Sequence, residues 1–335
     1  MNPSSARSGT GRSALFDNLK VLLIFLVVFA HLLEARQGGE LSNTLYLIIY
    51  SFHMPAFIFV SGWFSRRSTV KKTLTHILVP YLVFQVLYLL FAGQPIQFHS
   101  PYWILWYLFA LLVWRLILPI LRLWKPLAYL ILPVSVALSL LGGYADWVGY
   151  PFSLSRILVF WPYFMLGYCL SGNQDVLEHL RSAGSRTVSL LAAVGCAGFL
   201  VVTRNTFQCT WMYGSTGYHA AGGTPELRLF LLMMALLWIW FLLAWVPKTS
   251  VASLSVIGQN TLYVYLLHGF IKIFMQNHAE AIYIYSPGVN VGIALAFALL
   301  LTAILGSPGL AKRWKTIKNG VLSLFPRKHT PAAVS

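Results

Sequence analysis

Four ionisable residues fall on one side of the first apolar segment of the chain. In DNLKVLLIFLVVFAHLLEAR, Asp17 and Lys20 stand at the start, His31 interrupts the apolar run, and Glu34 follows one turn later. A helix turns by about 100° per residue, so Lys20 and His31 share a face and lie about 16 Å apart along the axis. Because ionisable groups are costly against lipid, this face predicts a bundle interior or a water-filled cavity.

An imidazole in such a place suits general-base chemistry on a bound hydroxyl. His31 can take the proton, and Glu34 can orient the ring as the acid of a catalytic triad does. His53 and His268 also interrupt apolar runs, and we expect both to be catalytic, with His53 as the first choice for a hydrogen-bond donor to the oxyanion. Transient acylation of His31 itself is the open alternative.

A metal centre is not indicated by the histidine pattern. The three histidines lie on separate segments, and no pair of histidines at a spacing of four accompanies a carboxylate, as zinc sites on helices require. The three cysteines are scattered, so we expect no disulfide framework.

Two further segments carry polar groups that can serve the same site. Thr261, Tyr265, His268 and Lys272 share one face of their segment, since offsets of four, seven and eleven return to nearly the same angle. In LWYLFALLVWRLILP, we expect three side chains to contact the substrate. They are Trp106, Tyr107 and Arg115.

The composition places the chain in a membrane. Of 335 residues, 58% are hydrophobic and 10% are charged, and the mean hydropathy is +0.71, far outside the range of soluble domains. The 24 Lys and Arg residues against 8 Asp and Glu sit in short loops between apolar runs rather than on one surface. This distribution excludes nucleic acid as the expected partner and follows the positive-inside rule.

The sequence predicts an all-α integral membrane protein, a single bundle of about ten transmembrane helices with both termini in the cytoplasm. If the N-terminus is cytoplasmic, 18 of the 24 basic residues fall on the inner side. The expected domains are an N-terminal tail (1–14), the membrane domain (15–306) and a basic C-terminal tail (307–335). The expected spans are 15–33, 41–64, 74–91, 102–121, 127–141, 154–170, 188–203, 227–246, 251–274 and 289–305.

The loops on the two sides differ in character. The inner loop SRRSTVKK carries Arg66, Arg67, Lys71 and Lys72, which either hold the phosphates of a cytoplasmic donor or only set topology and contact anionic lipid. The outer loops 94–102, 142–153 and 205–226 are rich in Gly and aromatic residues. They either stack on a sugar or form an interfacial aromatic belt.

Taken together, these segments resemble the type-3 membrane acyltransferases, in the branch related to fucose 4-O-acetylase. The marker of that family is a basic residue, ten intervening residues and a histidine on the first span, which Lys20 and His31 match. The supporting phrases occur in the family's order over most of the chain. They are FHMPAFIFVSGWF (52–64), LWYLFALLVWRLILP (105–119), FWPYFMLGY (160–168) and GQNTLYVYLLHGFI (258–271).

The resemblance implies an acyltransferase that moves groups other than amino-acyl groups. Its co-substrate is cytoplasmic acyl-CoA, usually acetyl-CoA, no metal is needed, and its acceptor is a hydroxyl of a glycan or glycoconjugate at the outer face of the plasma membrane. Lys20 then lies on the side from which acyl-CoA enters, and the four basic loop residues lie near the CoA phosphates. The family's Arg-x-x-Arg pair is not reproduced in that loop, which leaves their role open. The alternatives are a transporter of a glycan or lipid-linked sugar and a membrane sensor without enzymatic activity.

Overall fold

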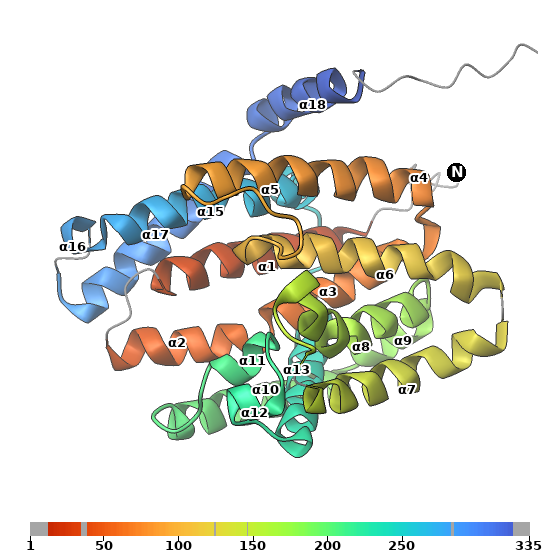
Figure 1. The fold of residues 1–335 in the computed structure, drawn as a ribbon. Coiled ribbons are helices and arrows are strands. Elements are labelled where there is room, and N and C mark those ends of the chain that lie inside the picture. Colours follow the sequence, from red (N-terminus) through yellow and green to blue (C-terminus); the bar gives the residue numbers. More distant parts are fainter. Residues whose placement is uncertain (1–12, 35–38, 124, 146, 283–284, 324–335) are drawn as a thin grey trace, which may run out of the picture.

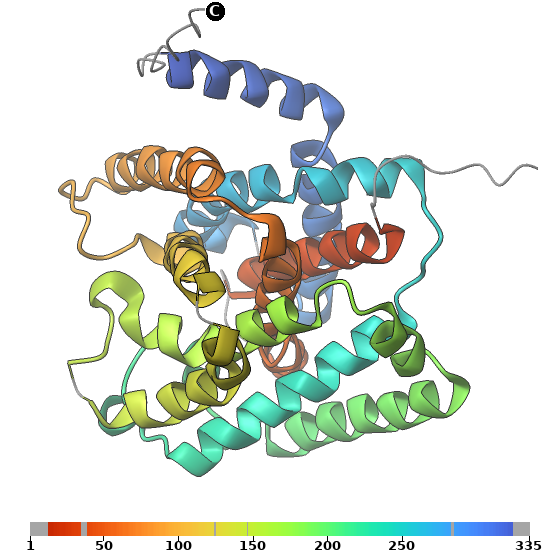
Figure 2. The same cartoon turned by 90° about the vertical axis from the view of Figure 1, so that its right-hand side faces the viewer.

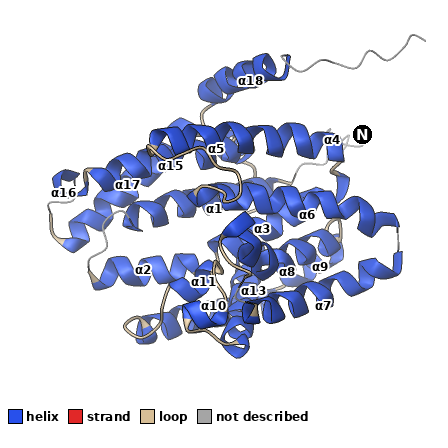
Figure 3. Ribbon diagram, in the orientation of Figure 1, coloured by secondary structure: helices blue, strands red, loops and turns tan. Residues whose placement is uncertain are grey.

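The regular elements of this chain are helical throughout the part that the structure describes. The computed structural model describes residues 13–34, 39–123, 125–145, 147–282 and 285–323 (Figure 1, Figure 3). Most of the predicted N-terminal tail and the last twelve residues therefore lie outside the described ranges. The all-α architecture predicted from the sequence is confirmed.

The helices fall into long segments and short connecting turns. The long ones are α1 (Ala14–Glu34), α2 (Glu40–Tyr50), α3 (His53–Trp63), α5 (Val79–Phe91), α6 (Trp106–Leu123), α7 (Lys125–Leu141), α8 (Leu154–Leu170), α10 (Ala183–Thr203), α13 (Pro225–Trp245), α15 (Thr261–Asn277), α17 (Pro287–Leu305) and α18 (Pro308–Ser323). The short ones are η1 (Phe64–Arg67), α4 (Val70–Thr73), η2 (Leu74–Leu78), η3 (Trp103–Leu105), η4 (Gly142–Tyr144), η5 (Pro151–Ser153), α9 (Gln174–Leu180), α11 (Thr210–Tyr213), α12 (Tyr218–Ala221), α14 (Ala252–Gln259) and α16 (Ala279–Ile282).

Eight helical segments among the described residues are long and apolar enough to cross a membrane. They are 14–34, 40–67, 70–91, 103–123, 151–170, 183–203, 225–245 and 287–305. The other two predicted spans fall on α7 and on α14 with α15, where α7 and α15 have 17 residues each. The count of ten and the cytoplasmic position of both termini stay predictions.

Helix α1 runs through the middle of the bundle. It contacts α2, α3, α14, α15 and α17. In α1, 67% of the residues of an apolar 18-residue stretch are buried, whereas 17% are buried in the corresponding stretch of the peripheral α10. Figure 1 and Figure 2 show α1 surrounded by helices that are distant in the sequence. The ionisable face of α1 is therefore turned into the protein, as its residue pattern predicts.

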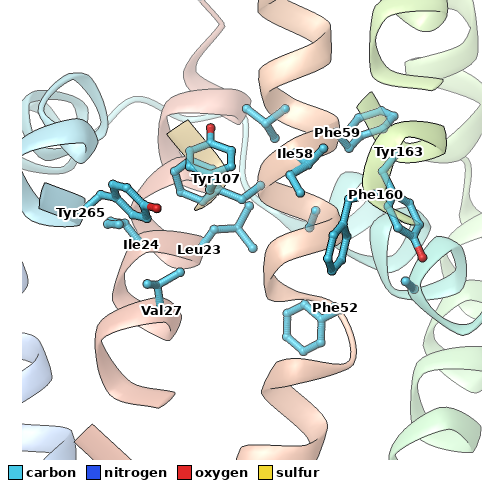
Figure 4. Packing of buried hydrophobic residues seen from close by; sticks show 14 of the residues in the cluster. Leu23, Ile24, Val27, Phe52, Ile58, Phe59, Tyr107, Phe160, Tyr163 and Tyr265 are labelled. Atoms are coloured by element: carbon cyan, nitrogen blue, oxygen red, sulfur yellow. The ribbon is translucent and has the colours of Figure 1, made fainter. Parts of the chain in front are cut away.

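Helices α3 and α8 cross closely because each presents a glycine to the other. A methyl group at Gly62 would lie 2.0 Å from the carbonyl oxygen of Phe164, and one at Gly167 would lie 2.0 Å from that of Phe59. Small residues at a crossing let two backbones approach within a membrane. Figure 4 shows the side chains packed around this contact, with Phe59 and Ile58 on α3 and Phe160 and Tyr163 on α8.

Helix α18 stands apart from the bundle and was not predicted. It follows α17 and lies beside the membrane helices rather than among them (Figure 1, Figure 2). The sequence analysis assigned this region to a basic tail without a helix. Basic residues one to three positions apart, Lys312, Arg313, Lys315 and Lys318, spread charge over the helical angles of this segment and obscured its period.

Candidate active site

His31 and Glu34 form a hydrogen-bonded pair at one end of α1. The Nδ1 atom of His31 lies 3.1 Å from Oε2 of Glu34, and Nζ of Lys272 on α15 lies 3.9 Å from the same oxygen. The spacing of three residues brings the two α1 side chains together on one face. A carboxylate at Nδ1 fixes that nitrogen as the one bearing hydrogen, so Nε2 of His31 is left to act as a base.

Aromatic side chains from three elements contact the His31 ring. The ring of His268 stacks on it with centroids 5.5 Å apart, and the ring of Trp103 meets its edge at 4.7 Å. The hydroxyl of Tyr50 lies 3.3 Å from Nδ1 of His31. The Tyr50 ring in turn contacts His53 at 4.7 Å. The three membrane histidines predicted as one site therefore do come together.

The tautomers of His53 and His268 limit what they can do. Nδ1 of His53 lies 2.8 Å from the carbonyl oxygen of Ile49, and Nδ1 of His268 lies 3.1 Å from that of Val264. A carbonyl oxygen only accepts, so both Nδ1 atoms carry hydrogen, and Nε2 of each neutral ring is an acceptor. Neither neutral ring can donate from Nε2 to an oxyanion, which argues against the donor role expected for His53.

A cavity of about 160 Å³ opens beside His31. Its wall includes His31, Glu34, Tyr50, His53 and Trp106, together with Arg156 from the first turn of α8. Tyr150, Met212 and Tyr213 also line it, so the outer loops 142–153 and 205–226 contribute to its wall. We call this the His31 cavity.

A second cavity of about 310 Å³ lies toward the opposite end of α1. Lys20, Ser61, Tyr107, Arg115 and His76 are among the residues that line it, and we call it the Lys20 cavity. Nζ of Lys20 pairs with Oδ1 of Asp17 at 2.9 Å, while Nε of Arg115 donates to Oγ of Ser65 at 2.9 Å. Two cationic side chains therefore face this second cavity.

Tyr265 is the residue that the walls of the two cavities have in common. Its hydroxyl donates to the carbonyl oxygen of Ile104, and its ring packs edge-on against Tyr107 with centroids 5.4 Å apart (Figure 4). Trp103, next to Ile104, has φ +28°, which is strained for a residue with a side chain. The hydrogen bond from Tyr265 thus stabilises the strained segment η3, in which Trp103 contacts His31.

Comparisons with known proteins identify the family of the chain. A family model described as an acyltransferase domain matches residues 14–311. The chain belongs to acyltransferase family 3. It is 25% identical to the nodulation protein NolL of Sinorhizobium fredii over 318 residues, covering 79% of this chain and 80% of that protein. No solved structure matches. The predicted family is confirmed, and the chain is a multi-pass membrane protein of that family.

Two of the substrate residues predicted for this acyltransferase lie away from His31. Trp106 lines the His31 cavity, whereas Tyr107 and Arg115 line the Lys20 cavity. The sequence analysis grouped all three in one substrate site. Neighbouring helical residues point about 100° apart, so Trp106 and Tyr107 face different cavities.

The cationic loop of this family member is not part of either cavity wall. Nη1 of Arg66 donates to the carbonyl oxygen of Ser171 at 2.6 Å, which ties α8 to the loop. Arg67, Lys71 and Lys72 are exposed. Their predicted contact with the phosphates of a donor stays a prediction, and Arg66 has at least a structural function.

The thiol of Cys209 lies within electrostatic reach of Glu34. Burial raises the pKa of the Cys209 thiol, in the loop before α11, to about 12, so this thiol stays protonated and is a poor nucleophile. Within the described ranges, no three His, Cys, Asp or Glu side chains are grouped to hold a metal ion.

Three residues of the site were missed in the sequence. Trp103 and Tyr50 are aromatic residues near the ends of apolar runs and look like interfacial anchors. Arg156 was counted only among the basic residues that do not fall on the inner side and are left for the outer loops or the membrane. Its position one turn into an apolar helix was the available signal, because a cation at that depth is costly without a function.

Proposed function

We propose that this protein is a membrane O-acyltransferase that moves an acyl group, in the first instance acetyl, from cytoplasmic acyl-CoA to a hydroxyl of a glycan or glycoconjugate. The observation that carries this proposal is the pairing of His31 with Glu34 at the wall of a cavity inside the membrane domain. Family membership supports the reaction class. The acyl-CoA donor, the carbohydrate acceptor and the plasma membrane are parts of the proposal.

The two cavities suggest how donor and acceptor meet. With the predicted topology, the Lys20 end of α1 faces the cytoplasm, and Lys20 and Arg115 attract the anionic donor into the larger cavity. The acceptor enters the His31 cavity from the outer side, between aromatic loops. The thioester reaches His31 beside Tyr265, the residue common to both walls.

His31 acts as a general base in this reaction. Its Nε2 takes the proton of the acceptor hydroxyl while the oxygen attacks the thioester carbonyl carbon. The C–S bond then breaks, the acyl ester forms, and the imidazolium returns its proton to the CoA thiolate. Glu34 stabilises the charged ring through Nδ1.

The oxyanion needs a donor other than a neutral His53 or His268. Trp106 is in the wall of the His31 cavity, and we assign the donor role to its indole N–H. His268 instead packs against the face of His31 and holds the ring in place. An acyl-imidazole intermediate on His31 would use the same residues.

A transporter of glycans or lipid-linked sugars is the weaker proposal. Membership in an acyltransferase family and a carboxylate-oriented histidine have no explanation in a carrier. Binding of acetyl-CoA to the purified protein, read as a thermal shift, separates the two proposals, because a glycan carrier has no use for that ligand.

The experiment that tests the function compares cells that express the wild-type protein or His31→Ala. Mass spectrometry should show the mass increase of an acetyl group on glycans from wild-type cells. Glycans from His31→Ala cells should lack this increase, although the variant is present in the membrane at the same level as the wild-type protein. The matched control is His278→Ala, since His278 is exposed beyond the end of α15. Unchanged acetylation by the His31 variant would remove the proposed mechanism.

A further inference from the structure

Arg156 presents a guanidinium group to the His31 cavity. Its group lies over the ring of Trp106 and over that of Tyr150, at 5.2 Å from each centroid. Its Nε donates to the carbonyl oxygen of Tyr213 at 3.3 Å. Two aromatic faces and one backbone carbonyl therefore fix the plane of the guanidinium in the cavity wall.

The charge of Arg156 has no acidic partner within the described ranges, where no carboxylate lies within 4 Å of it. Glu34, the acidic residue in the same cavity wall, is occupied by His31 at 3.1 Å and Lys272 at 3.9 Å. By contrast, Arg204, half-buried at the end of α10, pairs with the exposed Glu40 at 3.0 Å. The His31 cavity thus contains a cation that is not neutralised.

An uncompensated guanidinium in a membrane domain is costly unless a ligand supplies the opposite charge. Guanidinium presents its N–H groups in a planar fork that matches the two oxygens of a carboxylate or phosphate. Aromatic contacts hold the faces of the group and Nε donates to the carbonyl oxygen of Tyr213, so the two Nη atoms form the edge that can meet a ligand. The position of that edge, in the same cavity as His31, suits a charged group on the molecule that His31 deprotonates.

We propose that Arg156, with Trp106 and Tyr150, forms an anion subsite for the acceptor. The acceptor then carries a carboxylate or phosphate close to the hydroxyl that is acylated. The aromatic rings that hold Arg156 also offer faces for the sugar ring that bears both groups. This inference rests on the proposed function and narrows its substrate class from glycans in general to anionic glycans.

The acceptor for the test is the glycan whose acetylation depends on His31. It is purified in its unacetylated form from His31→Ala cells and offered, with labelled acetyl-CoA, to the purified full-length protein in lipid nanodiscs. One portion is left native, one is carboxyl-reduced and one is treated with phosphatase. The two treatments separate a carboxylate from a phosphate as the source of the charge.

We expect that substituting Arg156 and neutralising the glycan weaken binding of the glycan to the same extent. Arg156→Gln should raise the KM for the native glycan about 10- to 100-fold, as expected for loss of a charge-assisted hydrogen bond, and leave the KM for acetyl-CoA unchanged. Neutralising the glycan should raise the KM of the wild-type protein by a similar factor and add little to that of the variant. Arg156→Lys should fall between the two, and Arg204→Gln should behave as wild type.

Three results would overturn the subsite. The first is that the glycan acetylated through His31 bears no anionic group. The second is that the KM increases caused by Arg156→Gln and by neutralising the glycan add up. The third is that Arg156→Gln lowers kcat and leaves the KM for the glycan unchanged, which would place Arg156 at the oxyanion. An unchanged KM for acetyl-CoA shows that Arg156→Gln is folded, and Arg156→Lys supplies the same test if it is not. If no glycan loses acetyl groups in His31→Ala cells, the proposed function itself fails, and the subsite fails with it.

Discussion

Replacement of Glu34 by Gln removes one negative charge from the His31 pair and keeps its shape. The carboxylate lies 3.1 Å from Nδ1 of His31, so at an effective dielectric constant of about 20 its attraction for an imidazolium is about 5 kcal/mol. The Glu34 side chain is 24% exposed, and screening by water reduces this to roughly half, about 2 to 3 kcal/mol. Because about 1.4 kcal/mol corresponds to a factor of ten, we expect kcat to fall about 100-fold.

Lys272 makes the loss larger rather than smaller. Its ammonium lies 3.9 Å from the Glu34 carboxylate, and after the substitution it stays near His31 as an unpaired positive charge. This charge opposes formation of the imidazolium. The estimate of about 100-fold is therefore a lower value for the loss.

The assay measures labelled acetyl transfer to the glycan at saturating acetyl-CoA, with kcat and both KM values determined. We expect kcat to fall and both KM values to stay within about threefold, because Glu34 acts on the charge that forms during the reaction. The control is Glu40→Gln, an exposed carboxylate paired with Arg204. A kcat for Glu34→Gln within about threefold of wild type would refute the orienting role.

Three further substitutions test the cavities and the helix packing. Tyr265→Ala removes the side chain common to both cavity walls and should increase acceptor-independent hydrolysis of acetyl-CoA several-fold. Hydrolysis at the wild-type rate would show that Tyr265 does not keep the two cavities apart. Lys20→Ala should raise the KM for acetyl-CoA about tenfold by removing a cation from the donor cavity, and an equal rise in the KM for the acceptor would contradict that assignment. Gly167→Val forces side-chain atoms into the backbone of α3 and should abolish accumulation of folded protein in the membrane. Gly195→Val, at a glycine with open space around it, should accumulate normally. Equal yields of the two variants would refute the close crossing of α3 and α8.

Helical periodicity alone predicted the centre of the site. Lys20, His31 and Glu34 lie on one helix, so their shared face and the contact of His31 with Glu34 follow from residue spacing. The same reasoning placed His268 and Lys272 on one face of α15, and in the structure that face meets α1. Local geometry was sufficient wherever both partners belonged to one helix.

Contacts between segments that are distant in the chain could not be predicted from the sequence. Trp103 reaches His31 only because η3 adopts a strained turn, and no residue pattern indicates that turn. Arg156 meets Trp106 through the packing of α8 against α6. Arg66 has the composition of a phosphate ligand, yet it bonds to the carbonyl of Ser171, which lies more than one hundred residues away.

The measurement that tests the central claim most directly uses sealed proteoliposomes with labelled acetyl-CoA on the side of the Lys20 cavity and the glycan on the other side. The wild-type protein should place label on the glycan across the membrane, and His31→Ala, inserted in the same orientation and amount, should place none. Transfer by His31→Ala at the wild-type rate would contradict the claim that this imidazole, held by Glu34 between the two cavities, is the base of the reaction.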